Sequence, residues 1–289
     1  MRALLIGLVA VLAAIPSVSA TQEASLDDVL KAGRAYVSAY AAKVSGTVLD
    51  ERYTLIDAST GRMDVPTRVS SDLVILSVNG QPIALRDAYA INGAKIREAQ
   101  PRIPALLAEP TMEKWEQVRT YARESQRHFM AEIVVRLHDP MLALRFIAPE
   151  DPSKFTFSLE GRKKMDGVEV VGLRFQENRG EHTKYVLGTR GNGAVAGKFW
   201  LEPATGVIHQ TEFYLESKFE TGRVVVTYAN AKTLDMWLPS KTVENYQERE
   251  DTGGPTGMGA GGVGRSSKLE ATASYSNPRY TPIDLSKTR

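Results

Sequence analysis

The chain has 289 residues, with 36 basic and 34 acidic side chains, no cysteine and a formal net charge of +2. This nearly neutral balance argues against nucleic acid as the main partner, because phosphate binding needs a concentrated basic face. The lack of cysteine excludes disulfides, thiolate metal sites and a lipid anchor on a cysteine. Stability must therefore come from a core, which a chain of this length can bury.

The first 20 residues have the order of a cleavable secretory signal. Arg2 precedes an unbroken apolar run over residues 3–15, and small residues end the segment at Ala20. A run of about 13 apolar residues is shorter than the roughly 20 that a membrane-spanning helix needs. We therefore expect cleavage after Ala20 and a periplasmic or secreted protein that does not span a membrane. Residues 21–289 are expected to form a single domain.

An amphipathic helix is predicted at the start of the mature chain. Ser25 is a natural N-cap for a helix over residues 25–44, where apolar side chains recur every three or four positions. Alternating apolar residues then predict strands over 48–56 and 65–78. The second strand contains four consecutive apolar residues, 73–76, so we expect a central strand that is covered on both faces.

A helical insert is expected over about residues 84–148. An Asn92-Gly93 pair near its start favours a tight hairpin turn, because both residues tolerate positive φ angles. Charge placement and apolar spacing predict a helix over 111–126, and a short apolar helix is predicted at 141–147.

After residue 152 the chain alternates almost entirely between strands and tight turns. The predicted strands lie at 155–159, 168–175, 195–202, 207–219, 223–228, 241–248 and 268–275. Short links between consecutive strands favour a single antiparallel sheet. The glycine-rich stretch 253–264 lies between two of these strands, so we interpret it as a flexible loop within a hairpin.

No catalytic or metal-binding motif is convincing. Residues 257–262 match the dinucleotide pattern G-x-G-x-x-G, but a strand follows them, so the glycine-rich composition explains the match. The four histidines are His128, His138, His182 and His209. None has metal-ligand spacing, and His138-Asp139 before a proline indicates a loop and a helix N-cap. We expect no cofactor, no metal and no enzymatic activity.

Large apolar residues occupy both faces of the hairpin around residues 195–219. The candidate ligand-binding residues, on the face expected to point inward, are Phe199, Leu201, Phe213 and Leu215. A register error of one residue would exchange them for Trp200 and Tyr214. Ordinary core packing is the competing interpretation of these residues.

Several motifs of the strand-rich half are typical of one protein family. They are Phe199-Trp200-Leu201-Glu202-Pro203-Ala204-Thr205-Gly206, then 209–212, 224–228, Trp237-Leu238-Pro239 and 273–277. The pattern resembles the periplasmic lipoprotein-carrier superfamily, the Lol-type carriers and related outer-membrane lipoprotein-sorting proteins, over about residues 155–280. The resemblance implies an α+β fold, a strongly curved antiparallel sheet or incomplete barrel with helices on its concave side. It also implies a hydrophobic cavity that takes acyl chains.

Three functions therefore compete. The leading hypothesis is an exported, non-enzymatic protein that binds a lipid or another apolar molecule in a half-barrel cavity. The second is an envelope interaction or sensor module with a packed interior, whose partner is another envelope protein. The weakest is a hydrolase in which two carboxylates, such as Glu202 and Glu212, act together in a cleft.

Overall fold

The computed structural model describes residues 24–58, 65–129, 137–149, 151–178, 187–188, 191–217, 219–248, 267–283 and 285. The predicted signal segment 1–20, its cleavage site and the glycine-rich stretch 253–264 lie outside the described residues. No helix among the described residues is long and apolar enough to cross a membrane.

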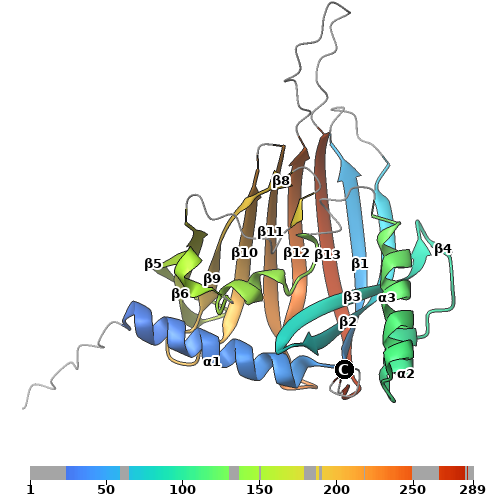
Figure 1. Ribbon diagram of the computed structural model, residues 1–289, viewed down its shortest axis with the longest axis horizontal. Coiled ribbons are helices and arrows are strands. Elements are labelled where there is room, and N and C mark those ends of the chain that lie inside the picture. The colour runs from blue at the N-terminus through green and yellow to red at the C-terminus, as the bar shows by residue number, and fades with distance from the viewer. Residues whose placement is uncertain are drawn as a thin grey trace, which may run out of the picture.

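One curved antiparallel sheet dominates the structure (Figure 1). Its strands are β1 (Thr47–Asp57), β2 (Thr67–Val78), β3 (Gln81–Ile91), β4 (Ala94–Lys95), β5 (Phe155–Met165), β6 (Val168–Glu177), β9 (Ala194–Leu201), β10 (Ile208–Glu216), β11 (Glu220–Ala231), β12 (Met236–Glu248) and β13 (Ser267–Tyr280). The strand order is β4-β3-β2-β1-β13-β12-β11-β10-β9-β6-β5. The last strand therefore pairs with the first, and β4 and β5 form the two edges. β7 (Leu187–Gly188) and β8 (Gly191–Asn192) form a separate two-stranded ladder.

The concave face is covered by α1 (Leu26–Val44) and the 3-10 helix η1 (Leu142–Phe146), which lie in front of the sheet in Figure 1. The side chain of Ser25 caps α1 by accepting a hydrogen bond from Asp28 N, as predicted. Gly33 allows close packing on this face, because a Cβ there would lie 2.5 Å from a side-chain atom of Ile147. A short 3-10 helix, η2 (Pro152–Lys154), leads into β5.

Two further helices, α2 (Arg102–Leu107) and α3 (Met112–Gln126), cover the other face of β2. Leu73 and Ile75 point into the main core on the concave side. Val74 and Leu76 point the opposite way, into a smaller core with residues of α2 and α3. All four side chains are fully buried, so β2 is covered on both faces as its apolar run predicts.

The α+β fold with a curved, open sheet is confirmed. The Asn92-Gly93 turn also forms, with φ angles of 50° and 84°. The insert differs in detail, because β3 continues the main sheet to Ile91 and helix begins only at Arg102. Leu85 and Arg86 bury side chains on opposite faces of β3, and this two-sided burial keeps the segment in the sheet. The apolar segment predicted as a short helix forms the 3-10 helix η1.

Candidate ligand-binding site

The four candidate ligand-binding residues lie side by side on the concave face of β9 and β10. Phe199, Leu201, Phe213 and Leu215 are 0%, 0%, 1% and 2% exposed. Tyr214 points the opposite way and is 37% exposed, as the pleat of a strand requires. We call the four buried residues the apolar floor. Their role in binding a ligand stays a prediction.

A phenyl ring from η1 rests on this floor. The ring of Phe146 lies 5.3 Å from that of Phe213. It also lies 5.3 Å from the ring of Phe175 on β6, to which it is nearly parallel at 2°. Gly197 makes room for this stack, since a Cβ there would lie 2.5 Å from the ring of Phe175. The floor is therefore covered by α1, which packs against Leu201, and by the inserted ring of Phe146, rather than by a second sheet.

We call residues 137–149, which include η1, the cover segment. Three side chains from elsewhere donate hydrogen bonds to its backbone carbonyls. Arg86 Nη2 donates to His138 O at 2.6 Å, Tyr228 Oη to Pro140 O at 2.8 Å, and Arg34 Nε to Ile147 O at 3.0 Å. Side-chain bonds of this kind each contribute about 1 kcal/mol. Buried apolar side chains of the cover segment, among them Met141 and Ile147 at 0% exposure, also hold it against the sheet.

At one end of the cover segment the concave face becomes polar. The four buried side chains that form this inner cluster are Glu51, Arg86, His138 and Glu244. Arg86 binds Glu51 through two nitrogens, at 2.7 and 2.8 Å. Glu244 Oε2 accepts hydrogen bonds from the hydroxyls of Tyr53 and Tyr246, at 2.8 and 2.9 Å. Each buried carboxylate therefore has strong donors, as burial of a charge demands.

Burial and the neighbouring charges shift the pKa values of the side chains in the inner cluster. Burial opposes the charge on Arg86, but the adjacent Glu51 outweighs burial and raises the pKa of the guanidinium. Burial likewise opposes the charge on Glu244, yet the hydrogen bond from the Tyr53 hydroxyl and the charge of Arg86 hold the pKa of this carboxyl below its usual value. Burial and the charge of Arg86 lower the pKa of His138, so its ring is neutral at pH 7.

A small cavity of about 60 Å³ adjoins the inner cluster. It lies between β3, α3 and the cover segment, and its walls include Arg86, Phe129, His138 and Asp139. The ring of His138 sits between the rings of Tyr53 and Phe129, with centroids 4.5 and 4.4 Å away. The cavity walls thus combine the aromatic ring of Phe129 with buried polar side chains.

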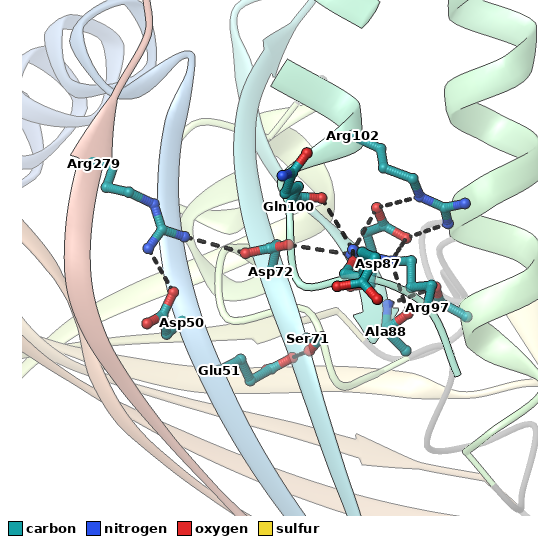
Figure 2. A network of polar contacts seen from close by, with 12 residues as sticks. Asp50, Glu51, Ser71, Asp72, Asp87, Ala88, Arg97, Gln100, Arg102 and Arg279 are labelled. Atoms are coloured by element: carbon teal, nitrogen blue, oxygen red, sulfur yellow. Dashed lines mark hydrogen bonds and ion pairs between the residues drawn. The ribbon is translucent and has the colours of Figure 1, made fainter. Parts of the chain in front are cut away.

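The opposite face of β1–β3 carries a second set of charges, which we call the outer ladder. Its members are Asp50, Asp72, Asp87, Arg97, Arg102 and Arg279. Figure 2 shows Asp72 between Arg279 and Arg97, each 3.1 Å away. Asp87 is fully buried and binds both Arg97, at 2.8 Å, and Arg102, at 2.6 Å. The ladder thus links β13 to β1 and β2 through Arg279, and α2 to β3 through Arg102. Burial raises the pKa of Asp72 despite its arginine neighbours.

The carboxylates of the hydrolase hypothesis have separate partners. Glu202 Oε1 lies 3.0 Å from His209 Nε2, in a partly buried pair. Glu212 binds the Tyr214 hydroxyl at 2.6 Å and Arg223 at 3.1 Å, on the outward face. Within the part of the chain that the structure describes, no group of three or more histidine, aspartate or glutamate residues is placed to hold a metal ion.

The inner cluster was missed by reasoning from the sequence. The prediction of a helix N-cap at His138-Asp139 is wrong, because η1 begins after Met141 and has no side-chain cap. Asp139 instead accepts a local hydrogen bond from Met141 N at 2.8 Å. His138, however, is buried at 3% exposure. A signal existed in the strand pattern, because Glu51, between apolar Leu49 and Tyr53, occupies an inward position of β1. Its partners come from three distant segments, which only the fold brings together.

The sequence matches no protein-family model and no curated protein. Solved structures resemble the fold at low identity. An outer membrane lipoprotein-sorting protein domain from Vibrio parahaemolyticus is 13% identical, with a TM-score of 0.44 and coverage of 90% of this chain and 95% of the other. A LolA-superfamily protein from Nitrosomonas europaea is 13% identical, with a TM-score of 0.33 and the same coverage. A DUF1329-family protein from Desulfovibrio piger is 9% identical, with a TM-score of 0.36 and coverage of 90% and 97%. The fold-level resemblance expected from the sequence is thus found, and TM-scores below 0.5 imply nothing about ligand or partner.

Proposed function

We propose that this protein is an exported, non-enzymatic binding protein that takes a lipid or another apolar molecule on the concave face of its sheet. The observation that carries the proposal is the closure of the apolar floor by the cover segment, whose Phe146 lies where an apolar ligand would lie. The ligand would enter by displacing this segment. We further propose that the protein acts in the periplasm or the medium, after removal of residues 1–20.

The affinity of such an exchange depends on how the gain of the ligand compares with the cost of displacing the cover segment. Each buried methylene contributes about 0.8 kcal/mol, so an acyl chain of about 14 carbons gains roughly 11 kcal/mol on leaving water. Displacing the cover segment costs the contacts of its buried side chains, among them Phe146 and Ile147 at 1% and 0% exposure. Affinity is the difference between these two quantities, and a net gain of about 8 kcal/mol corresponds to micromolar binding.

The test compares the cover with the floor. A fluorescent fatty acid is titrated into residues 21–289, Phe146→Ala and Phe213→Ala. If Phe146 competes with the ligand, Phe146→Ala tightens binding, whereas Phe213→Ala removes floor surface and weakens it. Both changes delete a buried phenyl ring, so each serves as the other's control for stability. Native mass spectrometry of the gently purified protein checks for a bound lipid. No uptake of the fatty acid or of a neutral or amine ligand of the same chain length by any of the three folded proteins, with no lipid in the native mass spectrum, would contradict the proposal.

A second candidate is the envelope interaction module. The close packing of the floor against Phe146 favours it, because this function needs no ligand-filled interior. The large exposed apolar residues among the described ones, such as Ile96, Met112 and Val168, lie on different elements. Bare protein that takes up no fatty acid, together with co-purification of an envelope protein, would favour this candidate.

A further inference from the structure

We propose that the cavity beside His138 binds the polar head group of the apolar ligand, and that this head group is a hydrogen-bond donor, preferably a primary ammonium. The inference rests on the proposed function and adds the chemistry of the ligand's polar end. It goes beyond an acyl-chain site, because it predicts discrimination among ligands that have the same chain.

The cavity has the right size and place. One water molecule needs about 10–15 Å³ of such volume, so about 60 Å³ holds roughly four waters or a head group of that size. His138 belongs to the cover segment, which also carries Phe146. A movement of the cover segment that admits an apolar chain to the floor would therefore open this cavity at the same time.

Buried polar atoms in and beside the cavity are unsatisfied. Among the described residues, neither ring nitrogen of His138 has a hydrogen-bond partner, nor does Glu244 Oε1. His138 Nδ1 lies 3.5 Å from Glu244 Oε1, which is long for such a bond. Buried polar groups are nearly always hydrogen-bonded, and an exception calls for an explanation. Because a neutral imidazole has one N–H and one accepting nitrogen, a donor group on a ligand in the cavity would satisfy the accepting nitrogen of His138.

The balance of charge favours a cation. The charged side chains that line the cavity are Arg86 and Asp139. Three more contact its lining residues: Glu51 contacts Arg86, Glu244 contacts His138, and Arg145 contacts Asp139. With the His138 ring neutral, the carboxylates exceed the guanidinium groups by one. Arg86 is already bound to Glu51 and to His138 O, and Arg145 lies 3.3 Å from Asp139. An ammonium group would neutralise the excess, whereas a carboxylate head group would increase it.

The experiment compares three ligands with one chain length. Dodecylamine, dodecanol and dodecanoic acid are titrated into residues 21–289 at pH 7, below their micelle concentrations. We expect the amine to bind roughly tenfold more tightly than the alcohol, because a charge-assisted hydrogen bond is stronger than a neutral one, and the acid to bind most weakly. Equal affinities, or tighter binding of the acid, would overturn the head-group inference alone. Failure of all three to bind would overturn the proposed function as well.

Matched variants test whether the preference for the amine depends on Glu244 and His138. Glu244→Gln keeps an acceptor for Tyr53 and Tyr246 but removes the charge, so the tenfold preference for the amine should disappear. Glu212→Gln is the control, because Glu212 also accepts a tyrosine hydroxyl but lies on the outward face. If Glu244→Gln does not fold, His138→Phe serves, since a phenyl ring suits the space between Tyr53 and Phe129. A folded variant of either kind that keeps the full preference would contradict the site.

Discussion

Strands β1, β2 and β3 carry charges on both faces, and the two sets differ in how completely they are paired. Adjacent side chains of a strand point to opposite faces, so Asp50 belongs to the outer ladder and Glu51 to the inner cluster. In the ladder, acidic and basic side chains alternate from Asp50 to Arg102, and the sets balance at three and three (Figure 2). In the inner cluster, Glu244 and His138 keep unsatisfied atoms beside a cavity. Complete pairing suits a structural clamp, whereas incomplete pairing suits a site that receives a ligand.

The largest expected effect is a loss of stability at the centre of the outer ladder. Asp87→Ala leaves Arg97 and Arg102 without their shared carboxylate, and Asp87 is fully buried. Breaking a buried ion pair in this way typically costs about 3–5 kcal/mol. Urea unfolding should show this loss, while the folded variant binds the fatty acid as before. A loss below about 1 kcal/mol would mean that the ladder is not a clamp.

The contribution of the Glu51–Arg86 ion pair to stability can be measured by removing one or both charges. Arg86→Met leaves Glu51 buried and unpaired, so we expect a loss of about 3 kcal/mol. The double change Glu51→Met with Arg86→Met removes the charge problem and should recover most of the loss. Urea unfolding of the two single variants and the double variant measures the coupling. Additive losses would show that the two side chains do not act as a pair.

Acid should destabilise the protein through the inner cluster. Because the pKa of His138 is lowered in the folded state, protonation below about pH 6.5 favours the unfolded chain. The pKa of Glu244 is also lowered, so its contribution is present above about pH 4.5 and is lost as pH falls further. Asp72 acts in the opposite direction, since its raised pKa makes its contribution largest in acid.

The free energy of unfolding should therefore fall as pH is lowered from 7 to about 5, by at most about 1.4 kcal/mol per pH unit for one proton. Urea unfolding at several pH values measures the slope. His138→Phe should flatten it over this range, with His128→Phe, on a half-buried residue after α3, as the control. An unchanged slope in His138→Phe would contradict this assignment.

The smallest effect is expected at the exposed end of the outer ladder. Arg279 is 43% exposed, and Asp72 keeps Arg97 when Arg279 is removed. Arg279→Ala should therefore cost about 1 kcal/mol or less in urea unfolding. Half a molar of salt should reduce the cost further, because an exposed pair is screened. A loss as large as that of Asp87→Ala would show that the two ends of the ladder are equivalent.

The sequence predicts the fold better than the site. Local signals locate α1 through its Ser25 cap, the Asn92-Gly93 turn and the two-sided burial of β2, because each depends on residues close in the chain. The inward face of β9 and β10 follows from strand alternation. The inner cluster cannot be found in this way, since Glu51 and Glu244 lie 193 positions apart, 244 minus 51, and meet only after β13 pairs with β1. The cover segment was likewise predicted only as a short apolar helix.

The central claim is that the cover segment leaves the floor when a ligand binds. The native chain has no cysteine, so Ala143→Cys places a single thiol in the cover segment at a position that is 3% exposed. Ala271→Cys, equally buried at 3% on β13, is the matched control. We predict that a saturating fatty acid speeds maleimide labelling of Ala143→Cys and leaves labelling of Ala271→Cys unchanged. Bound fatty acid with no change at either thiol would contradict the displacement of the cover segment.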